Sequence, residues 1–185
     1  MADQASQGFF SPVLRSARLN AARPWLKGTV LDVGCGSGAL AAFVDKDKYT
    51  GFDQDHQSIE VARRHFPAHR FCTSLPDNAQ YDTVVALALL EHLSDPQKEL
   101  EKWAEKLAPG GNIVLTTPHK AFRIAHDLGA KIGLFSSGAA DEHEEMFDRR
   151  GLHRLAQRSG LSVVHYQRFL AWANQLLVLN APSRH

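Results

Sequence analysis

Short, continuously apolar stretches alternate along this chain with segments whose apolar residues recur every three or four positions. The first kind predicts buried strands, and the second kind predicts helices with one apolar face. The predicted strands cover residues 29–33, 48–53, 69–72, 81–89, 112–118, 161–169 and 173–180, and the predicted helices cover residues 9–27, 37–44, 55–66, 95–107 and 148–159. This alternation predicts an α/β domain on a parallel sheet, which binds ligands at the carboxyl ends of its strands.

Two of the predicted helices begin at aspartates that suit the N-cap position. Asp55 precedes one helix, and Asp95, followed by Pro96 in the first turn, precedes another. The sequence APGG at residues 108–111 is expected to end the second helix. Residues 73–80 leave little room for a full crossover helix between the third and fourth strands.

Residues 119–147 break the alternation, because a weakly helical stretch is followed there by the sequence SSGAA and by an acidic run. We expect this segment to be an insertion that caps the sheet. With no internal repeat in the chain, we expect residues 1–185 to form a single domain, in which residues 1–28 supply an N-terminal helix and lid.

The composition is that of an ordinary globular domain, with 44% hydrophobic and 22% charged residues among 185. A net charge of +1 supplies no broad positive field, so we expect no nucleic-acid partner. Cys35 and Cys72 form neither a disulfide framework nor a paired metal motif. Without a signal-like start or an apolar run of membrane-spanning length, the sequence predicts a cytoplasmic protein with no integral membrane association.

The sequence VLDVGCGSGAL places several glycines directly after a predicted strand. Gly34, Gly36 and Ala39 match the loose dinucleotide-binding fingerprint, and Asp53 stands 19 residues after Gly34, where a ribose-binding acid is expected. A tight turn that needs glycine conformations explains the same glycines without any ligand. Asp32 favours a third interpretation, because a carboxylate beside the loop repels phosphate and attracts an ammonium group.

Four motifs, VLDVGCGSG, YTGFDQD, YDTVVALALLEHLSDP and LAPGGNIVLTTP, occur in an order and spacing that is specific as a set. Through them, residues 26–118 resemble the class I S-adenosylmethionine-dependent methyltransferases, particularly the small-molecule branch with the type 11 domains and the ubiquinone-biosynthesis O-methyltransferases. The last two predicted strands resemble, more loosely, the reversed strands that close that fold. The resemblance implies a Rossmann-like three-layer sandwich whose seven-stranded, mostly parallel sheet has an antiparallel C-terminal strand.

The resemblance also implies S-adenosylmethionine as the cofactor. Its carboxylate is expected near the exposed amides of Cys35 and Gly36 at a helix N-terminus, and its ammonium near Asp32. Asp53 is placed to accept hydrogen bonds from both ribose hydroxyls. Many relatives carry an acid for adenine after the third strand, whereas this chain has RFCTSLP, which leaves backbone or Ser74 for that role. The expected cofactor-binding residues are Asp32, Gly34, Cys35, Gly36, Asp53, Gln54, Cys72, Thr73 and Leu87.

Methyl transfer to a weakly acidic oxygen benefits from a general base near neutral pKa, which draws attention to the histidines. His119 follows the fifth predicted strand, at the edge over which an acceptor would lie, and His143 could swing inward from the cap. These two histidines are the candidate catalytic residues, although both also suit solvated loop positions. For His92 we expect a structural contact or one with the edge of the adenosine.

Some relatives hold a divalent metal with a glutamate three residues before a Glu–His pair. Glu91 and His92 match the pair, but Ala88 stands where the first glutamate would be. The missing oxygen ligand leads us to expect no metal site. Cys35 could gain thiolate character in the loop, but we expect it to pack against the cofactor rather than to act as a nucleophile.

The sequence therefore predicts an enzyme that transfers a methyl group from S-adenosylmethionine to a small organic acceptor. O-methylation of a phenolic, quinone-like or lipid-like compound is the favoured reaction. Two other classes stay open: a non-catalytic module that binds S-adenosylmethionine or S-adenosylhomocysteine, and an NAD(P)-dependent oxidoreductase. Neither the acceptor nor the oligomeric state follows from the sequence.

Overall fold

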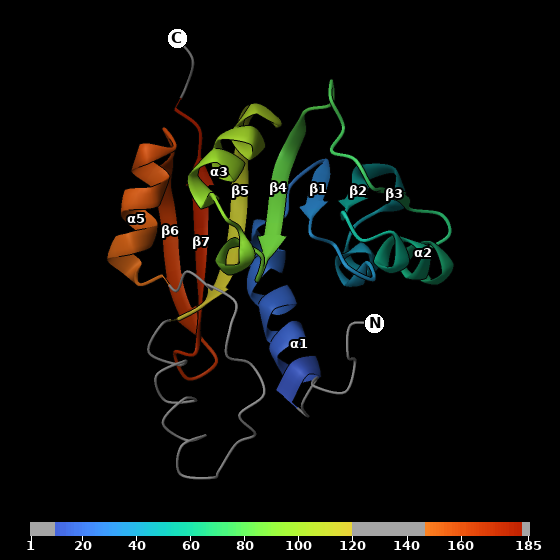
Figure 1. Ribbon diagram of the computed structural model, residues 1–185, viewed down its shortest axis with the longest axis horizontal. Helices are drawn as coiled ribbons and strands as arrows, with labels where there is room; N and C mark the ends of the chain where they lie inside the picture. The colour runs from blue at the N-terminus through green and yellow to red at the C-terminus, as the bar shows by residue number, and fades with distance from the viewer. Residues whose placement is uncertain (1–9, 120–146, 183–185) are drawn as a thin grey trace.

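The computed structural model describes residues 10–119 and 147–182, which form one seven-stranded sheet covered by helices (Figure 1). The strand order is β3-β2-β1-β4-β5-β7-β6. The strands are β1 (Val30–Val33), β2 (Tyr49–Phe52), β3 (Arg70–Cys72), β4 (Tyr81–Leu87), β5 (Leu107–Pro118), β6 (Ser162–Phe169) and β7 (Asn174–Asn180). The helices are α1 (Phe10–Ala22), α2 (His56–His65), α3 (Pro96–Glu105) and α5 (Arg149–Arg158), with short 3-10 helices η2 (Arg23–Trp25), η3 (Ala39–Phe43), η4 (Lys46–Lys48) and η5 (Leu90–His92).

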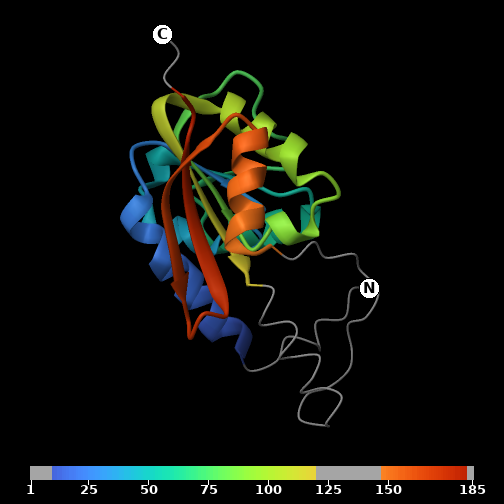
Figure 2. The ribbon, with the colours of Figure 1, turned by 90° about the vertical axis from the view of Figure 1, so that its left-hand side faces the viewer.

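The sheet is parallel from β3 to β5, and β7 pairs antiparallel with both β5 and β6. Helix α1 lies on one face of the sheet, and α3 and α5 lie on the other (Figure 2). Each face has its own apolar core, in which Leu19 and Ala22 of α1 pack on one side and Leu100 and Trp103 of α3 on the other. The predicted three-layer sandwich and its antiparallel C-terminal strand are therefore confirmed.

Both predicted aspartate caps are present. The Asp55 carboxylate accepts hydrogen bonds from Gln57 N and Ser58 N, each at 3.1 Å. The Asp95 carboxylate accepts one from Lys98 N at 3.0 Å, and Pro96 occupies the first turn of α3. Each cap pairs amide groups that have no partner within the helix, so these residues fix where α2 and α3 begin.

Two local predictions are wrong. Residues 37–44 form no α-helix but only the five-residue 3-10 helix η3, which follows Gly38 in the left-handed conformation. The APGG sequence at 108–111 does not separate α3 from the next strand, because β5 already begins at Leu107. The strand bulges there, since its register with β4 shifts between Tyr81 and Thr83, and Gly110 supplies the positive φ of 78°.

Polar side chains at the amino ends of β1, β4 and β5 form a hydrogen-bonded group, which we call the amino-end network: Thr83 and Asn112, which are buried, Asp82, which is half-buried, and Thr29, which is exposed. The Thr83 hydroxyl oxygen lies 2.9 Å from Lys27 N, 3.0 Å from Lys27 O and 3.2 Å from Asn112 Oδ1. Asp82 Oδ2 accepts hydrogen bonds from the Thr29 amide and hydroxyl at 2.8 and 2.9 Å. The network fixes the entry into β1 against β4 and β5.

Of the expected cap at residues 119–147, residues 120–146 lie outside the described residues, and the candidate His143 lies among them. The first nine residues of the expected lid lie outside the described residues as well. Among the helices that the structure describes, none is long and apolar enough to cross a membrane.

Candidate functional site

The glycine loop after β1 has one face that is open. Gly34, Gly36 and Gly38 have φ values of 69°, 52° and 82°. A Cβ atom at Gly34 would lie 3.0 Å from the Leu89 side chain, and one at Gly38 would lie 2.9 Å from the Phe71 ring. A Cβ atom at Gly36 would meet nothing within 4 Å. Packing therefore explains the absence of side chains at two of these glycines, whereas the backbone of Gly36 faces open space that a ligand can approach.

The amides of this loop are already paired, so the prediction that those of Cys35 and Gly36 are exposed is wrong. Gly34 N and Cys35 N both donate to Phe52 O, at 2.8 and 3.0 Å. Gly36 N donates to Asp53 Oδ2 at 2.9 Å. The loop folds over the end of β2, which satisfies these amides within the protein, and no α-helix begins there to bind a carboxylate.

Asp53 follows β2 directly and is held by two backbone amides. Its Oδ2 accepts from Gly36 N and its Oδ1 accepts from Asp55 N, both at 2.9 Å. An ionised carboxylate has about four acceptor positions, so each oxygen keeps capacity for a further hydrogen bond. The half-buried carboxylate is therefore preoriented for a vicinal diol, although its ribose role stays a prediction.

Asp32 is more deeply buried than the sequence suggested. It lies within β1, is 3% exposed, and accepts a 2.7 Å hydrogen bond from the Tyr49 hydroxyl. Burial raises the pKa of Asp32 to about 7, with the Tyr49 hydrogen bond opposing this shift and nearby Asp53 adding to it. A buried acid of this kind favours a cation nearby, but its contact with the cofactor ammonium stays a prediction.

The other expected cofactor residues lie at the carboxyl ends of β2, β3 and β4. Gln54 is exposed, whereas Thr73 and Leu87 are half-buried. Asp53 N donates to Cys72 O at 3.2 Å, which joins the ends of β2 and β3. Burial raises the pKa of both the Cys35 and the Cys72 thiol, so the structure gives no support to a thiolate nucleophile.

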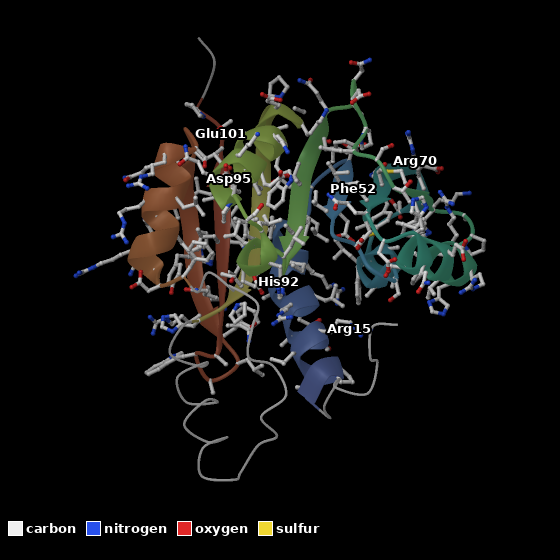
Figure 3. The ribbon with its side chains drawn as sticks, in the orientation of Figure 1. Arg15, Phe52, Arg70, His92, Asp95 and Glu101 are labelled. Carbon is white, nitrogen blue, oxygen red and sulfur yellow. The ribbon has the colours of Figure 1, made fainter. Side chains whose placement is uncertain are left out.

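The carboxyl end of β4 carries backbone strain. Ala88 has a φ of 53° although it is not a glycine, and its amide donates to Thr116 O at 2.8 Å. Figure 3 shows His92 at this end of β4, where the chain leaves toward α3. His92 is exposed. Strain of this kind costs about 1 to 3 kcal/mol and collects at functional sites.

A group of polar residues that the sequence pattern did not predict lies near this point, and we call it the carboxyl-end cluster: Glu91, Thr116, Thr117 and Asn174, which are buried, and Arg18, which is half-buried. Glu91 is 2% exposed, Thr116 0% and Thr117 1%. Within the part of the chain that the structure describes, Glu91 Oε2 and both threonine hydroxyls have no hydrogen-bond partner. Unpaired buried polar atoms are uncommon, and a missing ligand is one reason for them.

Charge near Glu91 comes from α1. Arg18 Nε donates to Asn174 Oδ1 at 3.0 Å, which joins α1 to the start of β7. Burial raises the pKa of Glu91, while Thr117, His92 and Arg18 act in the opposite direction. The Thr117 hydroxyl lies close enough for this effect but does not have hydrogen-bond geometry with the carboxyl group.

A sequence signal for this cluster exists in two strands. β5 changes from apolar residues to Thr116 and Thr117, and β7 begins with Asn174 and Gln175 before its own apolar run. The antiparallel register places Thr117 opposite Gln175, so the polar ends of the two strands lie side by side. The pairing of β5 with β7 is needed to see this, because the two segments are far apart in the sequence.

His119 follows β5 and is 7% exposed. Its amide donates to Ala173 O at 2.9 Å, and its Nε2 lies 2.8 Å from the Arg168 guanidinium. Because arginine only donates, Nε2 is the acceptor in this contact and its lone pair is engaged. The catalytic role of His119 stays a prediction. No three His, Cys, Asp or Glu side chains among the described residues are grouped so that they could hold a metal ion.

Comparisons with known proteins agree with this geometry. A family model described as a methyltransferase domain matches residues 8–166. A ubiquinone biosynthesis O-methyltransferase of Coxiella burnetii (strain Dugway 5J108-111) is 33% identical over 110 residues, which are 53% of this chain and 47% of that protein. The chain thus spans about half the length of this curated relative.

Two solved structures share the fold at low sequence identity. Magnesium protoporphyrin IX methyltransferase from Synechocystis PCC 6803, with bound SAH, is 16% identical with a TM-score of 0.72, covering 97% of this chain and 90% of that one. The putative methyltransferase in complex with the Haloferax volcanii Trm112 activator is 17% identical with a TM-score of 0.74, covering 96% of both chains. With the methyltransferase-domain match over most of its length, the chain belongs to the class I S-adenosylmethionine-dependent methyltransferases.

Proposed function

We propose that this protein transfers a methyl group from S-adenosylmethionine to an oxygen atom of a small phenolic, quinone-like or lipid-like acceptor. The observation that carries this proposal is the hydrogen bond between Gly36 N and Asp53, beside the open face of the loop. It lies at the end of β1, which stands between β2 and β4 where the strand order reverses. Sheets of this kind bind their ligands at that point.

The residues present fit S-adenosylmethionine better than a dinucleotide. A diphosphate needs free amide donors, whereas the amides of Gly34, Cys35 and Gly36 all donate within the protein. Asp32 and Asp53 place two carboxyl groups at the same edge, which suits a ligand with an ammonium group and a diol. Family membership and this donor set together argue against an NAD(P)-dependent oxidoreductase.

S-adenosylmethionine supplies a methyl group that is already activated on a sulfonium centre. The tasks left to the protein are to orient the acceptor, to exclude water and, for a hydroxyl acceptor, to receive a proton. His119 and His143 are the sequence-based candidates for the last task. The first must release Arg168 before its Nε2 can act as a base, and the second lies outside the described residues.

The name of the curated relatives, ubiquinone biosynthesis O-methyltransferase, supports oxygen as the methylated atom and a quinone-related ring as the acceptor. The methyltransferase-domain match supports an enzyme over a module that only binds the cofactor. We propose a small-molecule acceptor and a cytoplasmic location on the same basis.

Two measurements test this proposal. Calorimetric titration with S-adenosylhomocysteine and with NADH is expected to show binding of the first only. Transfer of a tritium-labelled methyl group from S-adenosylmethionine to a panel of hydroxybenzoates and catechols, and to a metabolite extract, is then expected to yield labelled ether products. Binding of NADH in place of S-adenosylhomocysteine would contradict the proposal, and binding without transfer to any acceptor would identify a non-catalytic module.

A further inference from the structure

Glu91 lies in the segment that covers the glycine loop. It belongs to η5, which follows β4. Leu89, two residues earlier, packs over Gly34, where an added Cβ atom would lie 3.0 Å from the Leu89 side chain. The Glu91 side chain is 2% exposed, and its Oε2 has no hydrogen-bond partner among the residues described. A buried, unpaired carboxyl oxygen thus lies two residues after the side chain that packs on the loop that we assign to the cofactor.

A second unpaired group lies near the Glu91 carboxyl group. The Thr117 hydroxyl is 1% exposed and also has no partner in the described ranges, and it is near enough to lower the pKa of Glu91. Leaving both groups unpaired in the interior lowers stability. A carboxylate that accepts and a hydroxyl that donates or accepts are together complementary to an O–H group of a ligand.

The positive charge near Glu91 is held apart from it. Arg18 donates through Nε to Asn174, and the structure gives no ion pair between Arg18 and Glu91, two residues that it describes. Among the described residues, His92 is the other charged or titratable group that acts on Glu91, and it is exposed. The carboxylate therefore keeps its accepting capacity, while a nearby cation favours negative charge that develops on a bound oxygen.

We propose that Glu91 binds the methyl acceptor and receives the proton of its hydroxyl group, an inference that rests on the proposed methyl transfer. The acceptor O–H bond breaks and its proton passes to Glu91 Oε2. The freed electron pair on oxygen forms the new C–O bond with the sulfonium methyl group, and the C–S pair stays on sulfur, which becomes a neutral thioether. The negative charge of Glu91 and the positive charge of the sulfonium are both consumed, so charge balances.

This assignment differs from the one that the sequence favoured. Burial moves the pKa of Glu91 upward, toward the range in which a base works best near neutral pH. The Nε2 atom of His119, in contrast, already accepts from Arg168. Glu91 Oε2, which has no hydrogen-bond partner in the ranges that the structure describes, is therefore able to receive a proton without breaking a hydrogen bond there.

Glu91→Gln, Glu91→Asp and the control Glu105→Gln on the surface of α3 test the proposal. Calorimetry with S-adenosylhomocysteine is expected to give the same affinity for all variants as for the wild-type protein. With 4-nitrophenol added to the loaded protein below the pH at which the free probe ionises, the wild-type protein and Glu105→Gln are expected to show phenolate absorption. Glu91→Gln is expected to bind the probe as the neutral phenol.

Methyl transfer to 4-nitrophenol completes the test. In Glu91→Gln, kcat is expected to fall about 100-fold with KM nearly unchanged, and Glu91→Asp is expected to recover part of the loss. Phenolate absorption and turnover that persist in Glu91→Gln but vanish in His119→Ala would overturn the proposal while leaving the methyltransferase function intact. Failure of the wild-type protein to bind S-adenosylhomocysteine would instead overturn both.

Discussion

The two ends of strands β4 and β5 carry similar buried polar residues in opposite states. At the amino end, the Thr83 hydroxyl has partners at Lys27 and Asn112, and Asn112 Nδ2 donates to Trp25 O at 3.1 Å. At the carboxyl end, the Thr117 hydroxyl and Glu91 Oε2 have no partner in the described part of the protein. These four side chains, Thr83, Asn112, Glu91 and Thr117, are all almost completely buried.

The difference separates a polar group that serves the fold from one that serves a ligand. In a closed network, the hydrogen bonds between its members compensate the free-energy cost of removing them from water. The amino-end network therefore stabilises the folded chain. The carboxyl-end cluster leaves that cost uncompensated until something binds. Since ligands of parallel sheets bind at the carboxyl ends of the strands, the unpaired atoms lie where such a ligand is expected.

The largest expected effect concerns two acids whose pKa values are shifted in opposite directions. The pKa of Asp32 in β1 is raised, and that of Asp82 at the amino end of β4 is lowered. The pKa of Asp32 is raised from 3.8 to about 7, so the unfolded chain loses this proton first as pH rises. The free energy of unfolding is expected to fall by about 1.4 kcal/mol per pH unit across that interval and to level off above it. Urea denaturation near pH 4 and near pH 7 measures this loss.

Asp32→Asn is the matched variant, because its amide oxygen can still accept from Tyr49 while it cannot ionise. It is expected to remove most of the decline with pH. Hydrogen bonds from the Thr29 amide and hydroxyl lower the pKa of Asp82, so its carboxylate stabilises the fold and this stabilisation is lost as pH falls, the reverse of the Asp32 effect. Asp82→Asn is expected to remove this dependence at low pH. Equal slopes for Asp32→Asn and the wild-type protein would show that Asp32 is not held protonated.

The second effect concerns the pre-oriented part of the cofactor site. Asp53→Ala removes the acceptor of Gly36 N and of the expected ribose hydroxyls, and it is expected to weaken S-adenosylhomocysteine binding by roughly 1 to 3 kcal/mol. Asp95→Ala is the control, since it loses a helix cap of about 1 kcal/mol without touching the loop. Calorimetry that gives equal affinities for the two variants would exclude the ribose role.

The smallest effect tests the comparison most directly. Thr83→Val removes a paired hydroxyl and is expected to lower the free energy of unfolding by about 1 to 2 kcal/mol. Thr117→Val removes an unpaired hydroxyl of the same size and is expected to leave that free energy nearly unchanged or slightly higher. Chemical denaturation of the two ligand-free variants measures this, and equal losses would mean that Thr117 has a partner of its own.

Features set by neighbouring residues were predicted from the sequence. The helix caps at Asp55 and Asp95 and the glycine turn after β1 depend on residues within a few positions. All three features are present in the structure. The bulge at 108–111 was missed because Gly110 serves a strand here, although the same glycine-rich sequence suits a helix end.

Contacts between distant segments were not predicted. The pairing of Asp32 with Tyr49 needs β1 and β2 in register, and the amide partners of the loop need the end of β2 beneath it. The carboxyl-end cluster depends on α1, β4, β5 and β7 meeting, and Glu91 was considered only as part of a metal motif. Patterning along one segment carries no information about such partners, since they follow from topology.

The separation of the glycine loop from the polar ends of β5 and β7 also bears on how such proteins diverge. Residues at the two strand ends, such as Thr117 and Gln175, form no hydrogen bond with Gly36 or Asp53 in the structure. Substitutions at these few positions can therefore change which compound is methylated while binding of the methyl donor is retained. A duplicated copy of this gene could thus acquire a new substrate in a small number of mutational steps.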